Sequence, residues 1–309
     1  MMSNIAFVFP GQGSQQVGML NDFAEKFSLV ATTFEEASDA LGYNMSHLIS
    51  QGPVEELNKT EKTQPALLTV SVALYRLWLQ NGGAKPALFA GHSLGEYSAL
   101  VASGVLDFTA AVKLVELRGQ LMQQAVPTGE GLMAAVLGLS DEDVVAACVE
   151  ATQGDVVAAV NFNTPGQVVI AGSKAAVERA MVILKDKGAK RVLPLTVSVP
   201  SHCDLMKPAA EKLASALQDT MFNAPLAPII QNRVAAAVTN VAEIRQNLLE
   251  QLYMPVLWTR SVAAMSEAGI NEIIECGPGK VLTGLNKRIA TEVTHTAIGD
   301  LASFEKRIG

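Results

Sequence analysis

Residues 91–95 read Gly-His-Ser-Leu-Gly, and this G-x-S-x-G pattern places a serine where it can act as a nucleophile. An apolar run at 87–90 precedes the pattern, and Leu94, Tyr97 and Val101 recur after it at helical spacing. This order predicts a strand, a sharp turn and a helix, with the oxygen of Ser93 held above the end of a sheet. The alternative is a glycine-rich loop between a strand and a helix in which the serine is incidental.

A serine nucleophile needs a general base, and the chain has four histidines. His202 follows a proline-bent segment and precedes a predicted helix, and it comes after the serine, as in the elbow hydrolases. His47 and His295 have no motif around them, and the ring of His92 is expected to point to the side opposite the serine. His202 is therefore the candidate base, and the alternative is an ordinary loop histidine.

A glycine-rich loop follows the first predicted strand, at residues 5–9. A dinucleotide-binding turn is disfavoured there because position 16 is glutamine instead of the third glycine, and Pro10 precedes the turn. In elbow enzymes one oxyanion donor follows the nucleophile, and the other comes from a loop after an earlier strand. The backbone amides of Gln12 and Leu94 are the candidates for these two donors.

Arg118 falls in the middle of the apolar stripe of a helix that is predicted to begin after Asp107 and to run to about Gln124. An unpaired buried charge is costly, so this guanidinium must reach water or meet an anion. Two anions are possible, a carboxylate of the protein or a carboxylate of the substrate. The second would mean an acyl group that carries its own free acid.

The composition of the 309 residues is that of an ordinary α/β protein, with 49% hydrophobic and 17% charged residues. The net charge of −7 and the lack of a long basic run argue against a nucleic-acid partner. The early apolar stretch at 5–9 is too short for a signal peptide or a membrane span, so a cytoplasmic location without membrane attachment is expected. Cys148, Cys203 and Cys276 are widely spaced, which argues against disulfides and a metal site.

The fold is predicted to be α/β, with a small domain inserted into a larger one. Residues 127–196 follow the order βαββαβ of a ferredoxin-like domain. Residues 1–126 and 197–309 then form a discontinuous, hydrolase-like catalytic domain with a central parallel sheet. The insertion lies between Ser93 and His202 in the chain, so it is expected to form a cleft with the larger domain. In the larger domain, helices are predicted at 64–80, 241–252, 258–267 and 280–289, and strands at 87–90, 228–231 and 271–276.

With these residues identified, the sequence resembles the bacterial malonyl-CoA:acyl carrier protein transacylases over essentially its whole length. Six segments carry the resemblance, namely FVFPGQGSQ at 7–15, GHSLGEYSAL at 91–100, VELRGQLMQ around Arg118, NFNTPGQVVIAG at 161–172, VPSH at 199–202 and QLYMPVLW at 251–258. The resemblance implies that Ser93 is acylated, that His202 is the base and that Arg118 binds the malonyl carboxylate. It also implies that the amides of Gln12 and Leu94 form the oxyanion hole.

The resemblance also bears on how the histidine is oriented. A Ser-His-Asp triad would need an acid beside His202, but the sequence pattern singles out none. In the resembling family a backbone carbonyl takes this place, and here it belongs to Gln251. Without the resemblance, the side chain of Gln251 would be interpreted as exposed at the end of a helix.

The function that the resemblance implies is ping-pong transfer of malonyl from malonyl-CoA to acyl carrier protein in type II fatty acid synthesis. The coenzyme A thioester is then a substrate and no cofactor is expected, the carrier is a transient partner, and the chain is expected to act as a monomer. Two alternatives remain open at this point. One is a serine hydrolase or thioesterase with the same elbow, and the other is a non-catalytic module that binds the carrier.

Overall fold

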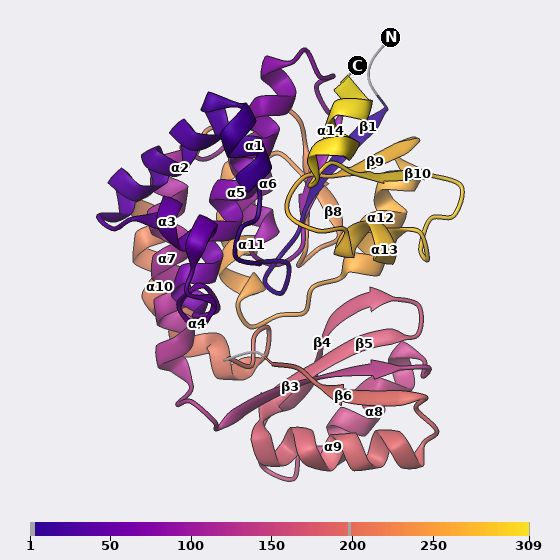
Figure 1. The fold of residues 1–309 in the computed structure, drawn as a ribbon. Coiled ribbons are helices and arrows are strands. Elements are labelled where there is room, and N and C mark those ends of the chain that lie inside the picture. The colour runs from indigo at the N-terminus through magenta and orange to yellow at the C-terminus, as the bar shows by residue number, and fades with distance from the viewer. Residues whose placement is uncertain (1–3, 197–198, 309) are drawn as a thin grey trace.

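The computed structural model describes residues 4–196 and 199–308, which form two β-sheets surrounded by helices (Figure 1). The strands of the larger sheet are β1 (Ile5–Phe9), β2 (Leu88–Gly91), β7 (Ile229–Gln231), β8 (Ala236–Val238), β9 (Glu272–Glu275) and β10 (Thr294–Ala297). Their order is β10-β9-β1-β2-β7-β8, and only the pair β7 and β8 is antiparallel. The predicted central parallel sheet is therefore confirmed.

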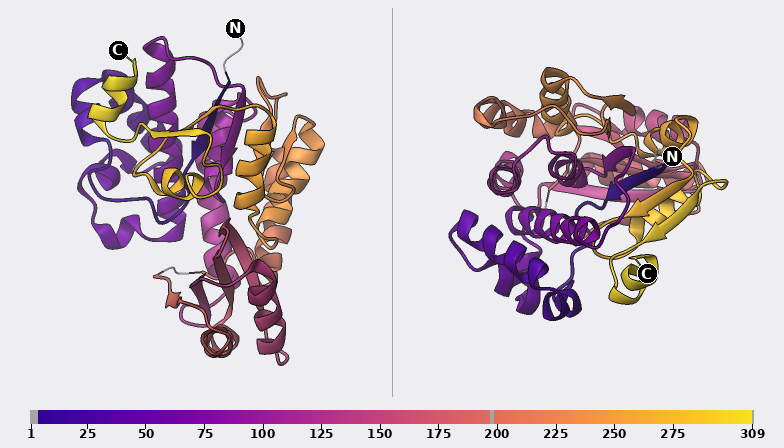
Figure 2. Two further views of the ribbon diagram at one scale, coloured as in Figure 1. Left: turned by 90° about the vertical axis from the view of Figure 1, so that its right-hand side faces the viewer. Right: turned by 90° about the horizontal axis from the view of Figure 1, so that it is seen from above.

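Helices cover both faces of this sheet, as a parallel sheet requires (Figure 2). The helices before the small sheet are α1 (Asn21–Lys26), α2 (Ser28–Leu41), α3 (Met45–Gln51), α4 (Val54–Leu57), α5 (Thr60–Gln80), α6 (Gly95–Ala102) and α7 (Phe108–Ala125). Those after it are the short 3-10 helix η1 (Asp204–Met206) and the helices α10 (Lys207–Asp219), α11 (Val241–Gln251), α12 (Trp258–Glu267), α13 (Val281–Asn286) and α14 (Leu301–Ile308).

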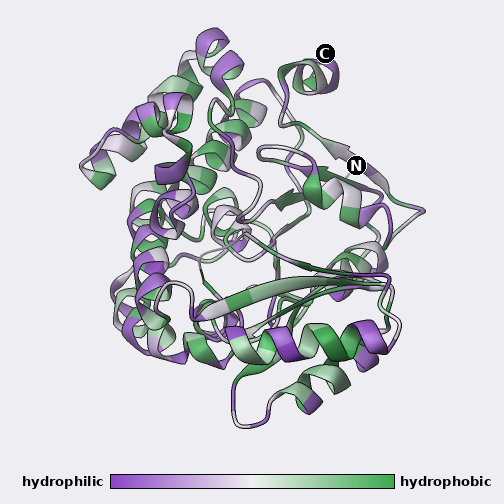
Figure 3. Ribbon diagram, turned by 60° about the horizontal axis from the view of Figure 1, so that its bottom comes forward, coloured by the Kyte–Doolittle hydropathy of each residue, from purple (hydrophilic) through white to green (hydrophobic). Residues whose placement is uncertain are grey.

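The side chains of the central strand β1 alternate between two different cores. Phe7 and Phe9 pack into the larger core, which includes residues of α2, α5, α6 and α7. Ala6 and Val8 pack into the smaller core with α12 and α13. Because every second side chain of a strand faces the same side, the bulky residues fill the thick helical layer and the small ones admit α12 closely. Hydrophobic colouring follows the inner strands, and hydrophilic colouring lies on the outer faces of the helices (Figure 3).

The smaller sheet has the topology predicted for residues 127–196. Its elements are β3 (Gly131–Leu137), α8 (Asp141–Ala151), β4 (Val157–Thr164), β5 (Gln167–Ser173), α9 (Lys174–Asp186) and β6 (Arg191–Pro194). The strand order is β4-β5-β3-β6 with antiparallel neighbours, which is the ferredoxin-like arrangement. In Figure 1 this sheet lies below the larger one, with α8 and α9 on its far side. The domain limits at 126/127 and 196/197 stay a prediction, and residues 197 and 198 lie outside the described residues.

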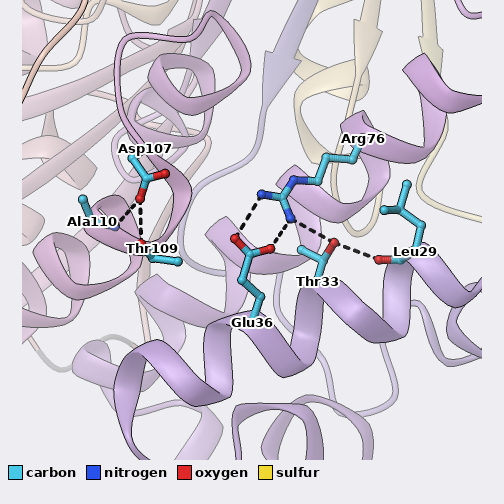
Figure 4. Close-up of polar contacts among 7 residues, drawn as sticks. All are labelled: Leu29, Thr33, Glu36, Arg76, Asp107, Thr109 and Ala110. Carbon is cyan, nitrogen blue, oxygen red and sulfur yellow. Dashed lines mark hydrogen bonds and ion pairs between the residues drawn. The ribbon is translucent and has the colours of Figure 1, made fainter.

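Polar contacts fix the helical layer that carries Arg118. The guanidinium of Arg76 on α5 contacts the carboxylate of Glu36 on α2 and stacks 4.6 Å from the ring centre of Phe108 at the start of α7 (Figure 4). Asp107 caps α7 as predicted, since its carboxylate accepts a hydrogen bond of 3.1 Å from the amide of Ala110. These contacts hold α7 against α5, and both helices supply residues to the site.

The structure differs from the prediction at some boundaries. Helix α5 begins at Thr60 and not at Gln64, so Pro65 lies inside it, where it has no amide to donate to the preceding turn. Strands β8 and β10 and helix α14 were not predicted. In the described ranges, no helix is long and apolar enough to cross a bilayer.

Candidate active site

Ser93 occupies the sharp turn between β2 and α6, as the G-x-S-x-G pattern predicts. Its backbone φ of 51° lies in the left-handed region, which a serine adopts only where the surrounding structure holds it there. A Cβ on Gly91 would lie 2.0 Å from the backbone of Gly95, and a Cβ on Gly95 would lie 2.0 Å from the carbonyl oxygen of Phe9. Glycine at both positions therefore lets α6 begin this close to β1.

His202 lies between the serine and the end of α11. Its Nε2 atom is 2.8 Å from the Oγ of Ser93, and its Nδ1 atom is 2.6 Å from the backbone carbonyl oxygen of Gln251. A carbonyl oxygen can only accept a hydrogen bond, so Nδ1 carries the ring proton and the lone pair of Nε2 faces the serine hydroxyl. The backbone amide of His202 also donates to the carbonyl of Leu252, at 2.9 Å. These two bonds orient the ring so that Nε2 faces the Ser93 hydroxyl.

The surroundings of His202 keep its imidazole neutral. Burial is the main reason that the pKa of His202 falls to about 3, and the positive charge of Arg118 lowers this pKa further. The hydrogen bond to the carbonyl of Gln251 opposes the fall. A histidine with so low a pKa has no proton on Nε2 near pH 7, which is the state that a general base requires.

Gln12 and Leu94, whose amides are the candidate oxyanion donors, line the same cavity as Ser93 and His202. In the described part of the chain, neither amide donates a hydrogen bond to a protein acceptor. A Cβ on Gly11 would lie 2.5 Å from the carbonyl oxygen of His92, so glycine there allows the loop after β1 to approach the elbow closely. Leu94 also immediately precedes the N-terminus of α6, where the helix dipole favours negative charge.

Arg118 is buried, with 1% of its surface exposed, and its guanidinium points to Ser93. One terminal nitrogen donates to Oε1 of Gln64 at 2.7 Å. The other lies 3.1 Å from Oε1 of Gln251 and 3.5 Å from the Oγ of Ser93. Within residues 4–196 and 199–308, no carboxylate forms an ion pair with Arg118, and its Nε atom has no hydrogen-bond partner. Of the two anions that the sequence left open, a protein carboxylate is not in contact with this guanidinium.

The side chain of Gln251 corrects one expectation from the sequence. Its position at the end of a helix suggested an exposed side chain, but Gln251 is 0% exposed. Its Nε2 atom donates to the carbonyl oxygen of Ser93 and to a carboxylate oxygen of Glu96, both at 3.1 Å. The backbone carbonyl and the side chain of Gln251 therefore reach both His202 and the nucleophile.

Three polar residues at the site were missed by sequence reasoning, namely Gln64, Glu96 and Asn232. Asn232 follows β7 and holds the elbow from beside: its Oδ1 accepts from the amide of Ser93 at 2.7 Å, and its Nδ2 donates to the carbonyl of Gly91 at 2.6 Å. Burial raises the pKa of Glu96 to about 7, while hydrogen bonds from Asn232, Gln231 and Gln251 oppose the rise. The only sequence signal was position, since Glu96 directly follows the elbow.

The ring of His92 contacts both parts of the molecule. Its Nε2 atom lies 2.8 Å from Oδ1 of Asn163 on β4, and its ring centre lies 5.5 Å from that of Trp258 on α12. Burial is the main reason that the pKa of His92 is lowered. His92 is therefore bonded to the small sheet and not to Ser93, and it lines the same cavity as the serine.

A cavity of about 190 Å³ joins these groups and lies between the two sheets. The small sheet and the segment after it contribute Met133, Asn161, Asn163, Val169 and Leu195. A parallel bridge between Asn161 and Val256 ties β4 to the larger part. Among the residues described, no three His, Cys, Asp or Glu side chains gather where they could hold a metal ion. The cavity thus presents a nucleophile, a base, free amides and a cation to one ligand.

A strained serine elbow, a neutral histidine and backbone amides without a protein acceptor in the described ranges are the arrangement expected of an enzyme that forms an acyl-serine. The family described as the acyl transferase domain matches residues 6–297. The chain belongs to this acyltransferase family and, within it, to the malonyl CoA-acyl carrier protein transacylases.

Similar proteins support this assignment over the full length. The malonyl CoA-acyl carrier protein transacylase of Escherichia coli K12 is 60% identical over 299 residues, or 97% of each chain. An acyl carrier protein S-malonyltransferase from Vibrio cholerae is 59% identical, with a TM-score of 0.96 over 98% of this chain and 99% of the other. A malonyl-transacylase solved in complex with its type II PKS acyl-carrier protein is 55% identical, with a TM-score of 0.98 over 99% of both chains.

Proposed function

We propose that this acyltransferase moves a malonyl group from malonyl-CoA to the phosphopantetheine thiol of acyl carrier protein, in fatty acid biosynthesis, through a malonyl-Ser93 intermediate. One observation carries the proposal: a buried guanidinium with no carboxylate partner among the described residues lies 3.5 Å from the oxygen of a serine that is hydrogen-bonded to a histidine. An acyl group that ends in a carboxylate fits that pair of groups, because it supplies the missing counter-ion while its thioester carbonyl meets the serine.

The first half of the reaction acylates the enzyme. The Ser93 hydroxyl proton moves to Nε2 of His202 as Oγ bonds to the thioester carbonyl carbon of malonyl-CoA. The amides of Gln12 and Leu94 donate hydrogen bonds to the oxyanion that forms. The carbon–sulfur bond then breaks, and the leaving thiolate takes the proton from His202. The carbonyl of Gln251 keeps the ring proton on Nδ1 throughout, so only Nε2 of His202 accepts and donates the proton that is transferred.

The second half runs through the same atoms in reverse. The phosphopantetheine thiol gives its proton to His202, and its sulfur attacks the carbonyl carbon of malonyl-Ser93. The bond between that carbon and Oγ breaks, and Oγ recovers the proton from His202. A single neutral histidine therefore serves as base for the incoming nucleophile and as acid for the leaving group in each half.

Arg118 selects the acyl group in this scheme. A malonyl carboxylate pairs with the guanidinium, whereas an acetyl group leaves the buried charge as it is in the free enzyme. Gln64 and Gln251 hold the guanidinium through neutral amide oxygens. These neutral oxygens position the guanidinium but form no ion pair with it, so the carboxylate of the substrate can do so.

The partners follow from the same scheme. Malonyl-CoA is the donor and acyl carrier protein is the transient acceptor, in line with the relatives of the same name and the neighbour solved with its carrier. We further propose that the enzyme needs no cofactor beyond its coenzyme A thioester substrate, acts as a monomer in the cytoplasm and has no nucleic-acid partner. The net charge of −7 supports the last point.

Intact mass spectrometry tests the proposal directly. After mixing with malonyl-CoA, the protein should gain the mass of one malonyl group, and a Ser93→Ala variant should gain none. The adduct should persist in buffer and disappear when acyl carrier protein carrying phosphopantetheine is added. Rapid loss of the adduct to water would instead indicate a hydrolase, and no adduct at all would indicate a module that only binds the carrier.

A further inference from the structure

A buried carboxyl group that faces hydrogen-bond donors lies behind the serine elbow. Glu96, in the first turn of α6, is 0% exposed, and its carboxylate accepts hydrogen bonds from three donors. Its Oε1 atom accepts from Nε2 of Gln231 at 2.9 Å. Its Oε2 atom accepts from the backbone amide of Asn232 at 2.7 Å and from Nε2 of Gln251 at 3.1 Å. The carboxylate forms no ion pair with Arg118 in the described ranges, so its contact with the cation is indirect.

The side-chain amide of Gln251 connects Glu96 to Arg118. Its nitrogen faces two oxygens that can only accept, the Glu96 carboxylate and the carbonyl of Ser93, at 3.1 Å each. The amide oxygen of Gln251 must therefore point the other way, where it accepts from the guanidinium of Arg118 at 3.1 Å. Reversal of this amide would place an N–H group against the guanidinium, which has only donors.

We propose that Glu96 is a positioning residue for malonyl recognition: its carboxylate fixes the side-chain amide of Gln251, and the oxygen of that amide holds the Arg118 guanidinium beside Ser93. The inference rests on the proposed function, because it takes Arg118 as the group that binds the malonyl carboxylate. Glu96 is not among the residues that line the cavity, and its effect on malonyl recognition passes through Gln251.

The chemistry of the pocket requires a carboxylate at this position. The amide of a Glu96→Gln variant has one accepting oxygen for three donors, and its NH2 group must face one of them. The backbone amide of Asn232 cannot turn. Gln231 resists turning as well, because its Oε1 atom accepts from Asn247 at 2.8 Å. Asn232 and Gln251 donate to the same oxygen, Oε2, so the accepting oxygen of the variant faces both of them and its NH2 group opposes Nε2 of Gln231. A neutral oxygen on a side chain that Gln231 displaces holds Gln251 less firmly than the carboxylate does, and the Arg118 guanidinium is then held less firmly beside Ser93.

The test compares two substrates on one preparation of the full chain. The ratio of kcat/KM for malonyl-CoA to that for acetyl-CoA does not depend on the folded fraction, so a loss of stability alone leaves it unchanged. We expect Glu96→Gln to lower this ratio about tenfold, mainly through a higher KM for malonyl-CoA, since the hydrogen bond that positions the charged guanidinium is weakened. Acetyl transfer, which makes no use of the carboxylate site, should change much less.

Three variants complete the experiment. In an Arg118→Ala background, Glu96→Gln should leave the ratio unchanged, because Glu96 and Gln251 then have no guanidinium to position. Glu96→Asp keeps the charge but shortens its reach, and it should give an intermediate ratio; this variant decides the matter if Glu96→Gln does not fold. Glu25→Gln, an exposed change on α1, should behave as wild type.

The outcomes separate this inference from the function on which it rests. A wild-type protein that forms no malonyl-Ser93 would overturn the proposed function. A wild-type protein that forms the adduct, together with Glu96 variants that keep the wild-type malonyl to acetyl ratio, would overturn the role of Glu96 alone. An equal loss for both substrates would likewise show that Glu96 only supports the fold.

Discussion

The Nδ1 atom of His202 lies 2.6 Å from the backbone carbonyl oxygen of Gln251, so a peptide group and not a carboxylate orients the base. A carbonyl dipole fixes the tautomer as an aspartate would, but it adds no full negative charge beside the imidazole. The largest effect of a charge on the ring is that of the Arg118 cation, which lowers the pKa of His202 further. The dyad is thus set to stay neutral before the reaction.

The low pKa of His202 predicts an unusual pH profile. Histidine has an ordinary pKa of 6.5, and here the value is about 3. A base loses activity as it is protonated, so the loss should begin only far below pH 6.5. We expect kcat/KM for acylation by acetyl-CoA, which makes no use of the carboxylate site that Glu96 supports, to stay flat from about pH 8 down to about pH 5. Stopped-flow measurement of CoA release checks this, and a tenfold fall per pH unit below an inflection near 6.5 would contradict it.

Removing the buried cation tests the selectivity of the site. Arg118→Ala should lower kcat/KM for malonyl-CoA about 100-fold, because two hydrogen bonds to a charged group are lost. Acetyl-CoA makes no such contact, so discrimination against it should relax. Arg118→Lys keeps the charge without the planar guanidinium, so its kcat/KM for malonyl-CoA should lie between the values of the wild type and Arg118→Ala. Initial rates with both substrates decide the point, and unchanged selectivity in Arg118→Ala would rule out its role.

The parts of the site that the sequence predicts are those whose signals are local. The elbow around Ser93 is a contiguous pattern between a strand and a helix, and the position of Arg118 on an apolar stripe is visible within one helix. The order of elements likewise predicted both sheets. His202 needed only a short list of histidines and a chain order, and it lies 2.8 Å from the serine.

The parts that the sequence does not predict arise from tertiary contacts. The base is oriented by a backbone carbonyl, which no residue type marks, and only the resemblance indicated Gln251. Glu96 stands in the first turn of a helix, where an exposed acid that complements the helix dipole is the ordinary expectation. Asn232 follows a strand of three residues, too short for a periodic signal. The edge strands β8 and β10 are similarly short, with three and four residues.

Asn232 holds the serine elbow through two hydrogen bonds, so its removal should lower the stability of the protein. Asn232→Ala leaves the partly buried amide of Ser93 and the buried carbonyl of Gly91 without their partners at 2.7 and 2.6 Å. We expect the free energy of unfolding to fall by about 3 kcal/mol, since each unsatisfied buried group costs about 1–3 kcal/mol. Urea denaturation measures this change. Asn271→Ala, at an exposed position, is the matched control. Equal effects in the two variants would show that the hydrogen bonds of Asn232 to the elbow do not stabilise the protein.

Two glycine substitutions should have opposite effects on stability, because Gly95 lies where α6 approaches β1 closely and Gly284 lies in open space. A Cβ at position 95 would lie 2.0 Å from the carbonyl oxygen of Phe9, so Gly95→Ala must push α6 and Ser93 away from the loop of Gln12. We expect a loss of about 3 kcal/mol in stability, together with a large fall in transfer, because the serine leaves the amides that stabilise its oxyanion.

Gly284 on α13 provides the matched substitution in open space. No atom lies within 4 Å of a Cβ built there, and the residue is exposed and helical. Gly284→Ala should therefore raise the free energy of unfolding by about 0.5–1 kcal/mol, since alanine restricts the unfolded chain more than glycine does. Urea denaturation and malonyl-transfer rates on both variants check the pair. If Gly95→Ala were as stable and active as Gly284→Ala, the contact with Phe9 would not determine the position of the nucleophile.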